Sequence, residues 1–159
     1  MKMKNVFIII TLLMLNSLSV IAETKSGTCG KNLTWALDDD GVLTIEGTGD
    51  MYDYSPTFED YHNFAPWFWN KVVYVIIREG VNSIGSYAFE CVPTVASVSL
   101  PQSLTSIGHG AFYGCSDLAS INLPNGVKEI HSTAFAQCSF TSITIPQSVT
   151  SIAPDAFSS

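Results

Sequence analysis

A repeat of 22–23 residues occupies the C-terminal part of the chain and constrains its fold more than any other feature. Four segments carry one pattern around an Ala-Phe pair: VNSIGSYAFEC, LTSIGHGAFYGC, VKEIHSTAFAQC and VTSIAPDAF. The four phenylalanines, Phe89, Phe112, Phe135 and Phe157, lie 23, 23 and 22 residues apart. A fixed period of this length is the signature of a solenoid, in which each repeat stacks on its neighbours.

Other apolar positions keep the same phase as the phenylalanines. Stacking the repeats places each of these positions over its equivalent, so that neighbouring repeats together bury a continuous core. The clearest such columns are Val75/Val98/Ile121/Ile143, Ile77/Leu100/Leu123/Ile145, Val81/Leu104/Val127/Val149 and Ile84/Ile107/Ile130/Ile152. We assign these side chains to the core and not to a ligand site.

Each repeat predicts two short extended segments. The first, such as VASVSLP, alternates apolar and small polar residues, as a half-buried strand does. A proline follows it in three copies and ends the strand, because proline has no amide donor. The second, such as LTSIG, is too short for a helix, and a turn of 3₁₀ helix is expected at the Ala-Phe pair. The predicted fold class is therefore a mainly β repeat solenoid over residues 72–159, with four repeats, the last incomplete.

The first 22 residues have the features of a secretory signal. Lys2 and Lys4 precede an apolar run, and small residues end at Ala22, where we expect cleavage. The uninterrupted apolar part, residues 6–15, is shorter than the roughly 20 residues that a membrane-spanning helix needs. The prediction is a secreted or cell-surface protein with no membrane insertion after signal removal; an uncleaved anchor is the alternative.

Removing residues 1–22 leaves five basic residues against fourteen acidic ones, a net charge of −9. A negative field of this size repels phosphate backbones and anionic lipids, and the sequence has no basic cluster to offset it. Nucleic acid is therefore excluded as an expected partner.

Residues 23–71 form a flank that differs from the repeats. Residues 33–37 and 42–46 predict two strands joined by a tight turn at Asp38-Asp39-Asp40-Gly41. A calcium loop is the competing interpretation of these aspartates, but the alternating acidic spacing and the distant glutamate are missing. We expect no metal and no cofactor.

The flank also contains a dense group of aromatic residues. Large rings can cover the first repeat of a solenoid, whose core otherwise faces water, and we interpret the group as such a cap. The alternative is a sugar-stacking platform, which requires two or more exposed, coplanar rings. The group consists of Tyr52, Tyr54, Phe58, Tyr61, Phe64, Trp67, Phe68 and Trp69.

The repeat resembles the BspA-type leucine-rich repeat of bacterial surface proteins. The segments VASVSLPQSLTSIGHGAFYGC and LASINLPNGVKEIHSTAFAQC carry the resemblance, and the flank from SGTCGKNLTW to APWFWNKV resembles the N-terminal region of such proteins. Arg78 replaces the proline of the first repeat, and His131 and Ala153 replace a glycine. The resemblance implies a right-handed leucine-rich-repeat superhelix and a role in adhesion or recognition at the cell surface.

No catalytic constellation is evident. His109 and His131 occupy different columns of successive repeats, and no motif supplies a nucleophile or a metal-binding pair. We therefore do not expect an enzyme; a hydrolase is the weakest of the alternatives. Cys91, Cys115 and Cys138 recur near the Ala-Phe pairs, and Cys29 lies in the flank. Disulfides are one interpretation, and reduced thiols turned inward at one corner of each repeat are the favoured one.

The strand face that points away from the core is the remaining candidate site. Alternate residues of the first strand in each repeat predict its members: Tyr74, Ile76, Ser97, Ser99, Ser120, Asn122, Ser142 and Thr144. Such a shallow, uncharged and hydroxyl-rich surface suits broad, weak contact with an extracellular protein, such as a host matrix protein, or with a glycan. A structural spacer within a larger surface protein is the competing hypothesis.

The repeats stop at Ser159 without a polar capping repeat. An uncapped solenoid exposes core residues and unpaired strand groups. We therefore expect self-association or fraying at the last repeat.

Overall fold

The computed structural model describes residues 24–55 and 63–159. The predicted signal lies outside the described residues, as do Phe58 and Tyr61 of the aromatic group. No helix among the described residues is long and apolar enough to cross a membrane.

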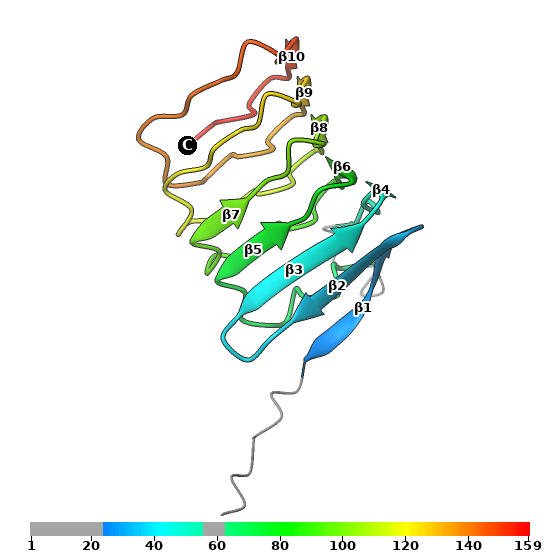
Figure 1. The fold of residues 1–159 in the computed structure, drawn as a ribbon. Helices are drawn as coiled ribbons and strands as arrows, with labels where there is room; N and C mark the ends of the chain where they lie inside the picture. Colours follow the sequence, from blue (N-terminus) through cyan, green and yellow to red (C-terminus); the bar gives the residue numbers. More distant parts are fainter. Residues whose placement is uncertain (1–23, 56–62) are drawn as a thin grey trace, which may run out of the picture.

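Within the described residues, ten strands form two five-stranded sheets (Figure 1). Sheet A has the order β1-β2-β3-β5-β7, and sheet B has the order β10-β9-β8-β6-β4. The bounds are β1 Lys25–Gly30, β2 Leu33–Leu37, β3 Val42–Gly47, β4 Gly49–Asp50, β5 Tyr74–Ile77, β6 Val81–Ile84, β7 Ser97–Ser99, β8 Ser106–Ile107, β9 Glu129–Ile130 and β10 Ser151–Ile152. We call each turn of the chain through both sheet positions a rung. The mainly β repeat fold predicted from the sequence is confirmed.

The flank is continuous with the repeats. The predicted hairpin forms as β2 and β3, and its turn is held by Asp38, whose carboxylate accepts the amides of Asp40 (3.1 Å) and Val42 (2.9 Å). Gly41 takes a φ of 83°, in the left-handed region that glycine adopts without steric cost. Strand β3 then pairs in parallel with β5, and β4 with β6. β3 and β4 therefore make a rung before the first repeat.

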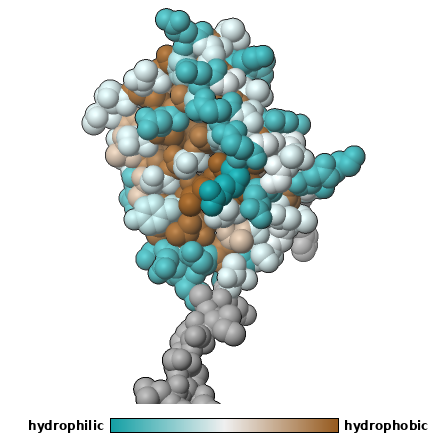
Figure 2. Space-filling view, in the orientation of Figure 1, coloured by the Kyte–Doolittle hydropathy of each residue, from teal (hydrophilic) through white to brown (hydrophobic). Residues whose placement is uncertain are grey.

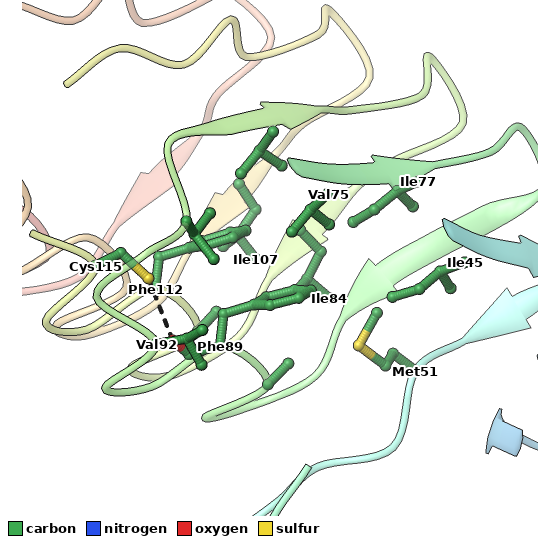
Figure 3. Close-up of a cluster of buried hydrophobic side chains, with 14 of the residues drawn as sticks. Ile45, Met51, Val75, Ile77, Ile84, Phe89, Val92, Ile107, Phe112 and Cys115 are labelled. Carbon is green, nitrogen blue, oxygen red and sulfur yellow. Dashed lines mark hydrogen bonds between the residues drawn. The ribbon is translucent and has the colours of Figure 1, made fainter. Parts of the chain in front are cut away.

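The apolar columns stack between the two sheets, as Figure 3 shows for Val75, Ile84, Ile107 and their neighbours. The phenylalanine column is the most regular. Its ring centroids lie 5.0, 5.4 and 5.4 Å apart from Phe89 to Phe157, with interplanar angles of 8° or less. The core therefore runs the length of the solenoid.

Trp67 lies on the N-terminal end of the phenylalanine column. Its ring is fully buried, stacks on Phe89 at 5.4 Å, and donates from Nε1 to the Ala88 carbonyl (2.8 Å). Trp35 and Tyr54 contact it edge-on at 5.8 and 5.9 Å. Trp67 therefore covers the Phe89 ring, which is the first ring of the phenylalanine column.

The sheet A strand is present only in the first two repeats, whereas the alternation predicted one in every repeat. Sheet A ends at β7, and the amides of residues 119–123 and 141–145 make no backbone hydrogen bond within the described residues. Sheet B, in contrast, continues to β10. Cross-rung hydrogen bonds continue at the phenylalanines of the same rungs, from the Phe112 amide to the Ala134 carbonyl and from the Phe135 amide to the Ala156 carbonyl (both 2.8 Å), so the loss is confined to the sheet A side.

The expected 3₁₀ helix at the Ala-Phe pair is replaced by successive turns. The residue before the alanine has a positive φ in every repeat, which a 3₁₀ helix does not allow. These residues are Tyr87 (58°), Gly110 (56°), Thr133 (55°) and Asp155 (59°).

The positive φ of Thr133 gives a testable stability prediction. A β-branched residue is disfavoured in the left-handed region, whereas asparagine tolerates it. We expect Thr133→Asn to raise the free energy of unfolding by about 1 kcal/mol, measured by urea denaturation. The reverse swap at the same column, Gly110→Thr, should destabilise, because a Cβ there would lie 2.8 Å from the Tyr87 ring. A stabilising Gly110→Thr would contradict this account.

Candidate functional site

Four predicted face residues lie on paired strands of sheet A and point away from the core. Tyr74 pairs in register with Ser97, and Ile76 with Ser99. The Tyr74 side chain is 50% exposed, the two serines are exposed, and Ile76 is half-buried. Inward Val75 and Val98 are buried between them, so the hydrophobic core holds this part of the face in place.

The other four predicted residues, Ser120, Asn122, Ser142 and Thr144, are exposed on the two rungs beyond β7. Strand pairing is absent on this side beyond β7, and two hollows lie here, one between β7 and the next rung and one between the last two rungs. One of about 410 Å³ is lined by Ser99, Gln102 and Asn122 among others. The second, of about 400 Å³, is lined by residues that include Asn122, Asn125, Ser142 and Thr144. Asn122 therefore borders both hollows.

The face also extends over the hairpin, which the sequence prediction did not include. A hollow of about 600 Å³ lies on β1, β2 and β3 and is lined by Ser26, Gly27, Thr28, Thr34, Trp35, Ala36, Thr44 and Glu46. The pairing places Ala36 opposite Thr44, and Thr44 opposite Ile76, so these residues continue one row. The alternating pattern of residues 33–37 and 42–46 could have predicted this extension, because inward Leu43 and Ile45 continue the inward columns of Val75 and Ile77.

We define the outer face as the eight predicted residues together with the outward-pointing residues of the hairpin region, which are Ser26, Thr28, Thr34, Ala36, Val42, Thr44 and Glu46. Its polar groups are hydroxyls and one amide, and Glu46 is its only charged member. In the view of Figure 2, apolar residues lie between hydrophilic and weakly polar ones. Such a mixed surface, supported by a rigid core, can form many hydrogen bonds and few ion pairs.

The aromatic group divides into buried and exposed parts. The Trp69 side chain is 73% exposed, but its ring stands at 87° to Phe68 and 62° to Phe64. A sugar-stacking platform requires coplanar exposed rings, and among the described rings Trp69 is not coplanar with Phe64 or Phe68.

Of the histidines, the structure describes His109 and His131, and these two are not brought together. His131 Nε2 lies 3.6 Å from a carboxylate oxygen of Glu129, beyond hydrogen-bond distance, and both side chains are about half exposed. The His109 ring contacts Tyr87 edge-on. Among residues 24–55 and 63–159, no group of three or more histidines, cysteines or acidic residues is placed to hold a metal ion.

All four cysteines are free thiols, and they differ in burial. Cys115 and Cys138 turn inward and donate to the Phe89 and Phe112 carbonyls of the preceding rung at 3.2 Å (Figure 3 for Cys115). Cys91 does not share this position, contrary to expectation. It lies one residue earlier in the repeat, where φ is 51°, and Val92 fills the inward place.

Differences in burial predict that Cys91, the exposed thiol, reacts faster than the other three. Desolvation raises the pKa of Cys29 to about 12 and of Cys138 to about 11, and raises that of Cys115 further. Thiolate is the reactive form, so these thiols should react slowly. We expect one fast equivalent in DTNB labelling of the native protein at pH 8, lost in Cys91→Ser. Four fast equivalents, or an unchanged count in Cys91→Ser, would contradict the burial described here.

The repeat region matches the family of the BspA type leucine rich repeat region, with six copies over residues 68–159. This match covers more than half of the chain, and the protein belongs to this family of bacterial leucine-rich-repeat proteins. A search of curated proteins finds no significant relative.

Solved structures of bacterial leucine-rich-repeat proteins share this fold. One from Eubacterium ventriosum is 28% identical with a TM-score of 0.63, over 81% of this chain and 40% of that chain. One from Bacteroides ovatus is 27% identical with a TM-score of 0.56, over 80% and 37%. The T. pallidum leucine-rich-repeat protein is 29% identical with a TM-score of 0.54, over 80% and 54%. The chain thus spans about two fifths to one half of these proteins.

Proposed function

We propose that this chain is an exported binding module that recognises an extracellular protein or glycan through the outer face. The observation that carries the proposal is the continuity of that face. It runs from the hairpin to the last rung with side chains that are exposed or half-buried, and strand pairing over buried columns holds the part from the hairpin to β7 in register. Its weak individual contacts gain strength when many copies act together on a cell surface.

A capture experiment tests this function. The purified chain is immobilised and presented with extracellular matrix proteins and with a glycan array, alongside a variant carrying Tyr74→Ala and Ser99→Arg. Thr105→Arg is the matched control, because Thr105 is exposed and directly precedes β8 of the opposite sheet. We expect a ligand that the outer-face variant loses and the control retains. Equal retention by all three proteins would contradict the proposed site.

The second candidate is a structural spacer, and the open C-terminal end favours it. Ile152 and Ile145 are 48% and 36% exposed, and Phe140 and Phe157 are only half-buried, although their equivalents in inner rungs belong to the core. Residues 139–159 contain one charged residue, Asp155, so no charge blocks pairing at this edge. A spacer would bind nothing in the capture experiment.

The open end predicts self-association of the isolated chain. Strand β10 pairs only with β9, which leaves its other edge free among the described residues. Light scattering after size exclusion should show concentration-dependent oligomers, and Ile152→Lys should shift the protein toward monomer. Hydrogen exchange should be faster at residues 140–145 than at residues 95–100. A sharp monomer with equal protection of both segments would show that the last rung is self-sufficient.

A further inference from the structure

We propose that the outer face binds an unbranched, uncharged glycan that runs along the solenoid axis and places about one sugar on each rung. This inference rests on the proposed function and names its ligand class. The hollows that carry it follow one another along a single face. The first lies on β1–β3, the second follows β7, and the third lies between the last two rungs.

The spacing of the face suits a polymer of sugars. Paired strands, as from β1 to β7, repeat at about 4.8 Å across a sheet, which is close to the length of one pyranose unit in an extended glycan. A glycan crossing the strands would therefore advance about one rung with each sugar. One row runs through Ser26, Ala36, Thr44, Ile76 and Ser99 by strand pairing and continues at Asn122 and Thr144 in the repeat register.

The hydrogen-bonding groups of the face also suit a sugar. Hydroxyl and amide side chains donate and accept, as sugar hydroxyls do. On the two rungs beyond β7, the backbone amides of residues 119–123 and 141–145 make no backbone hydrogen bond in the described structure. These amides can therefore donate to sugar hydroxyls. The Tyr74 ring, half exposed on β5 in the adjacent row of Val42 and Ser97, offers a face on which a sugar can stack.

Charge selects among glycans. Glu46 is the only charged side chain of the outer face, and the whole chain has a net charge of −7. Sulfated and uronic-acid polymers are therefore repelled. An extended protein segment fits less well, because it advances about 3.3 Å per residue and falls out of phase with the rungs. The second and third hollows, lined by polar and apolar groups together, also do not offer the apolar pocket in which a protein partner buries a central anchor.

Calorimetric titration of the full chain with defined oligosaccharides tests this inference. The probes are β-1,4- and β-1,3-linked glucose and β-1,4-linked N-acetylglucosamine oligomers of two to seven units, with heparin oligomers as the anionic control. We expect binding of at least one neutral series, with affinity that rises at least tenfold from the dimer to the hexamer. Tyr74→Ala and Asn122→Ala should each weaken the hexamer at least fivefold. Ser83→Ala on β6 and Thr105→Ala directly before β8 should leave it unchanged, and thermal unfolding of each variant checks that it remains folded.

Three results would overturn the inference: no neutral oligomer binds, affinity does not depend on length, or heparin binds more tightly. Equal weakening by sheet B variants would also overturn it. If the outer-face variant loses a protein partner in the capture experiment while no glycan binds, the proposed function stands and the glycan assignment fails. If no ligand of either class is captured, both fail.

Discussion

Replacing Phe112 by alanine should lower the free energy of unfolding by about 3–5 kcal/mol, which urea denaturation monitored by circular dichroism will measure. The Phe112 ring is fully buried and stacks on Phe89 at 5.0 Å and on Phe135 at 5.4 Å. Its removal leaves a cavity between two covered rungs. Neighbouring rings cannot close this cavity, because each is held by its own rung.

Phe157 is the matched control for Phe112. It stacks on Phe135 alone at 5.4 Å and is only half-buried at the open end of the column. Phe157→Ala should therefore cost much less, since water already reaches its outer side. Equal losses at the two positions would contradict the stacking order and would mean that the last rung is covered in solution.

Replacing Trp67 by alanine should destabilise the protein by a comparable amount, about 3–5 kcal/mol. The substitution removes a fully buried indole, its stacking on Phe89 and its hydrogen bond to the Ala88 carbonyl. It also exposes the first ring of the phenylalanine column. Trp67→Phe should recover most of the loss, because it restores the stacked ring but not the hydrogen bond, which is worth about 0.5–1.5 kcal/mol.

Trp69→Ala provides the control in the same segment. Trp69 is 73% exposed, so its loss should change the free energy of unfolding by less than about 1 kcal/mol. Thermal unfolding of the three variants beside the parent chain makes the comparison. A Trp69→Ala variant as unstable as Trp67→Ala would show that the exposed ring, and not Trp67, supports the end of the solenoid.

The outer face shows that the repeat pattern predicts side-chain direction but does not predict strand pairing. Alternation placed Ser97 and Ser99 outside and Val98 inside, because side chains of a strand point to opposite faces whatever the strand packs against. Whether those strands pair is a different matter. Ser120 and Asn122 share the pattern of Ser97 and Ser99, but their backbones make no ladder. Only the tertiary structure decides this, since the same rungs keep their cross-rung hydrogen bonds at the phenylalanines and lose them at residues 119–123 and 141–145.

The cysteines and the hairpin show the same limit. Cys91 and Cys115 both follow an Ala-Phe pair, but a one-residue offset exposes the first thiol and buries the second. The hairpin is readable as two strands from residues 33–37 and 42–46. Its parallel pairing with β5, which extends the candidate site by three strands, joins segments separated by the aromatic group. No local pattern records that pairing.

The sequence by itself determined the solenoid, its repeat length, the inward columns and the direction of the outer-face side chains. Each of these follows from the spacing of apolar residues along the chain, because a rung can bury its apolar side only against a rung of the same pattern. The tertiary structure alone decided where sheet A stops, where the hollows open, and how Trp67 meets the phenylalanine column. These features depend on distances between rungs, and side chains far apart in the sequence set those distances when they pack.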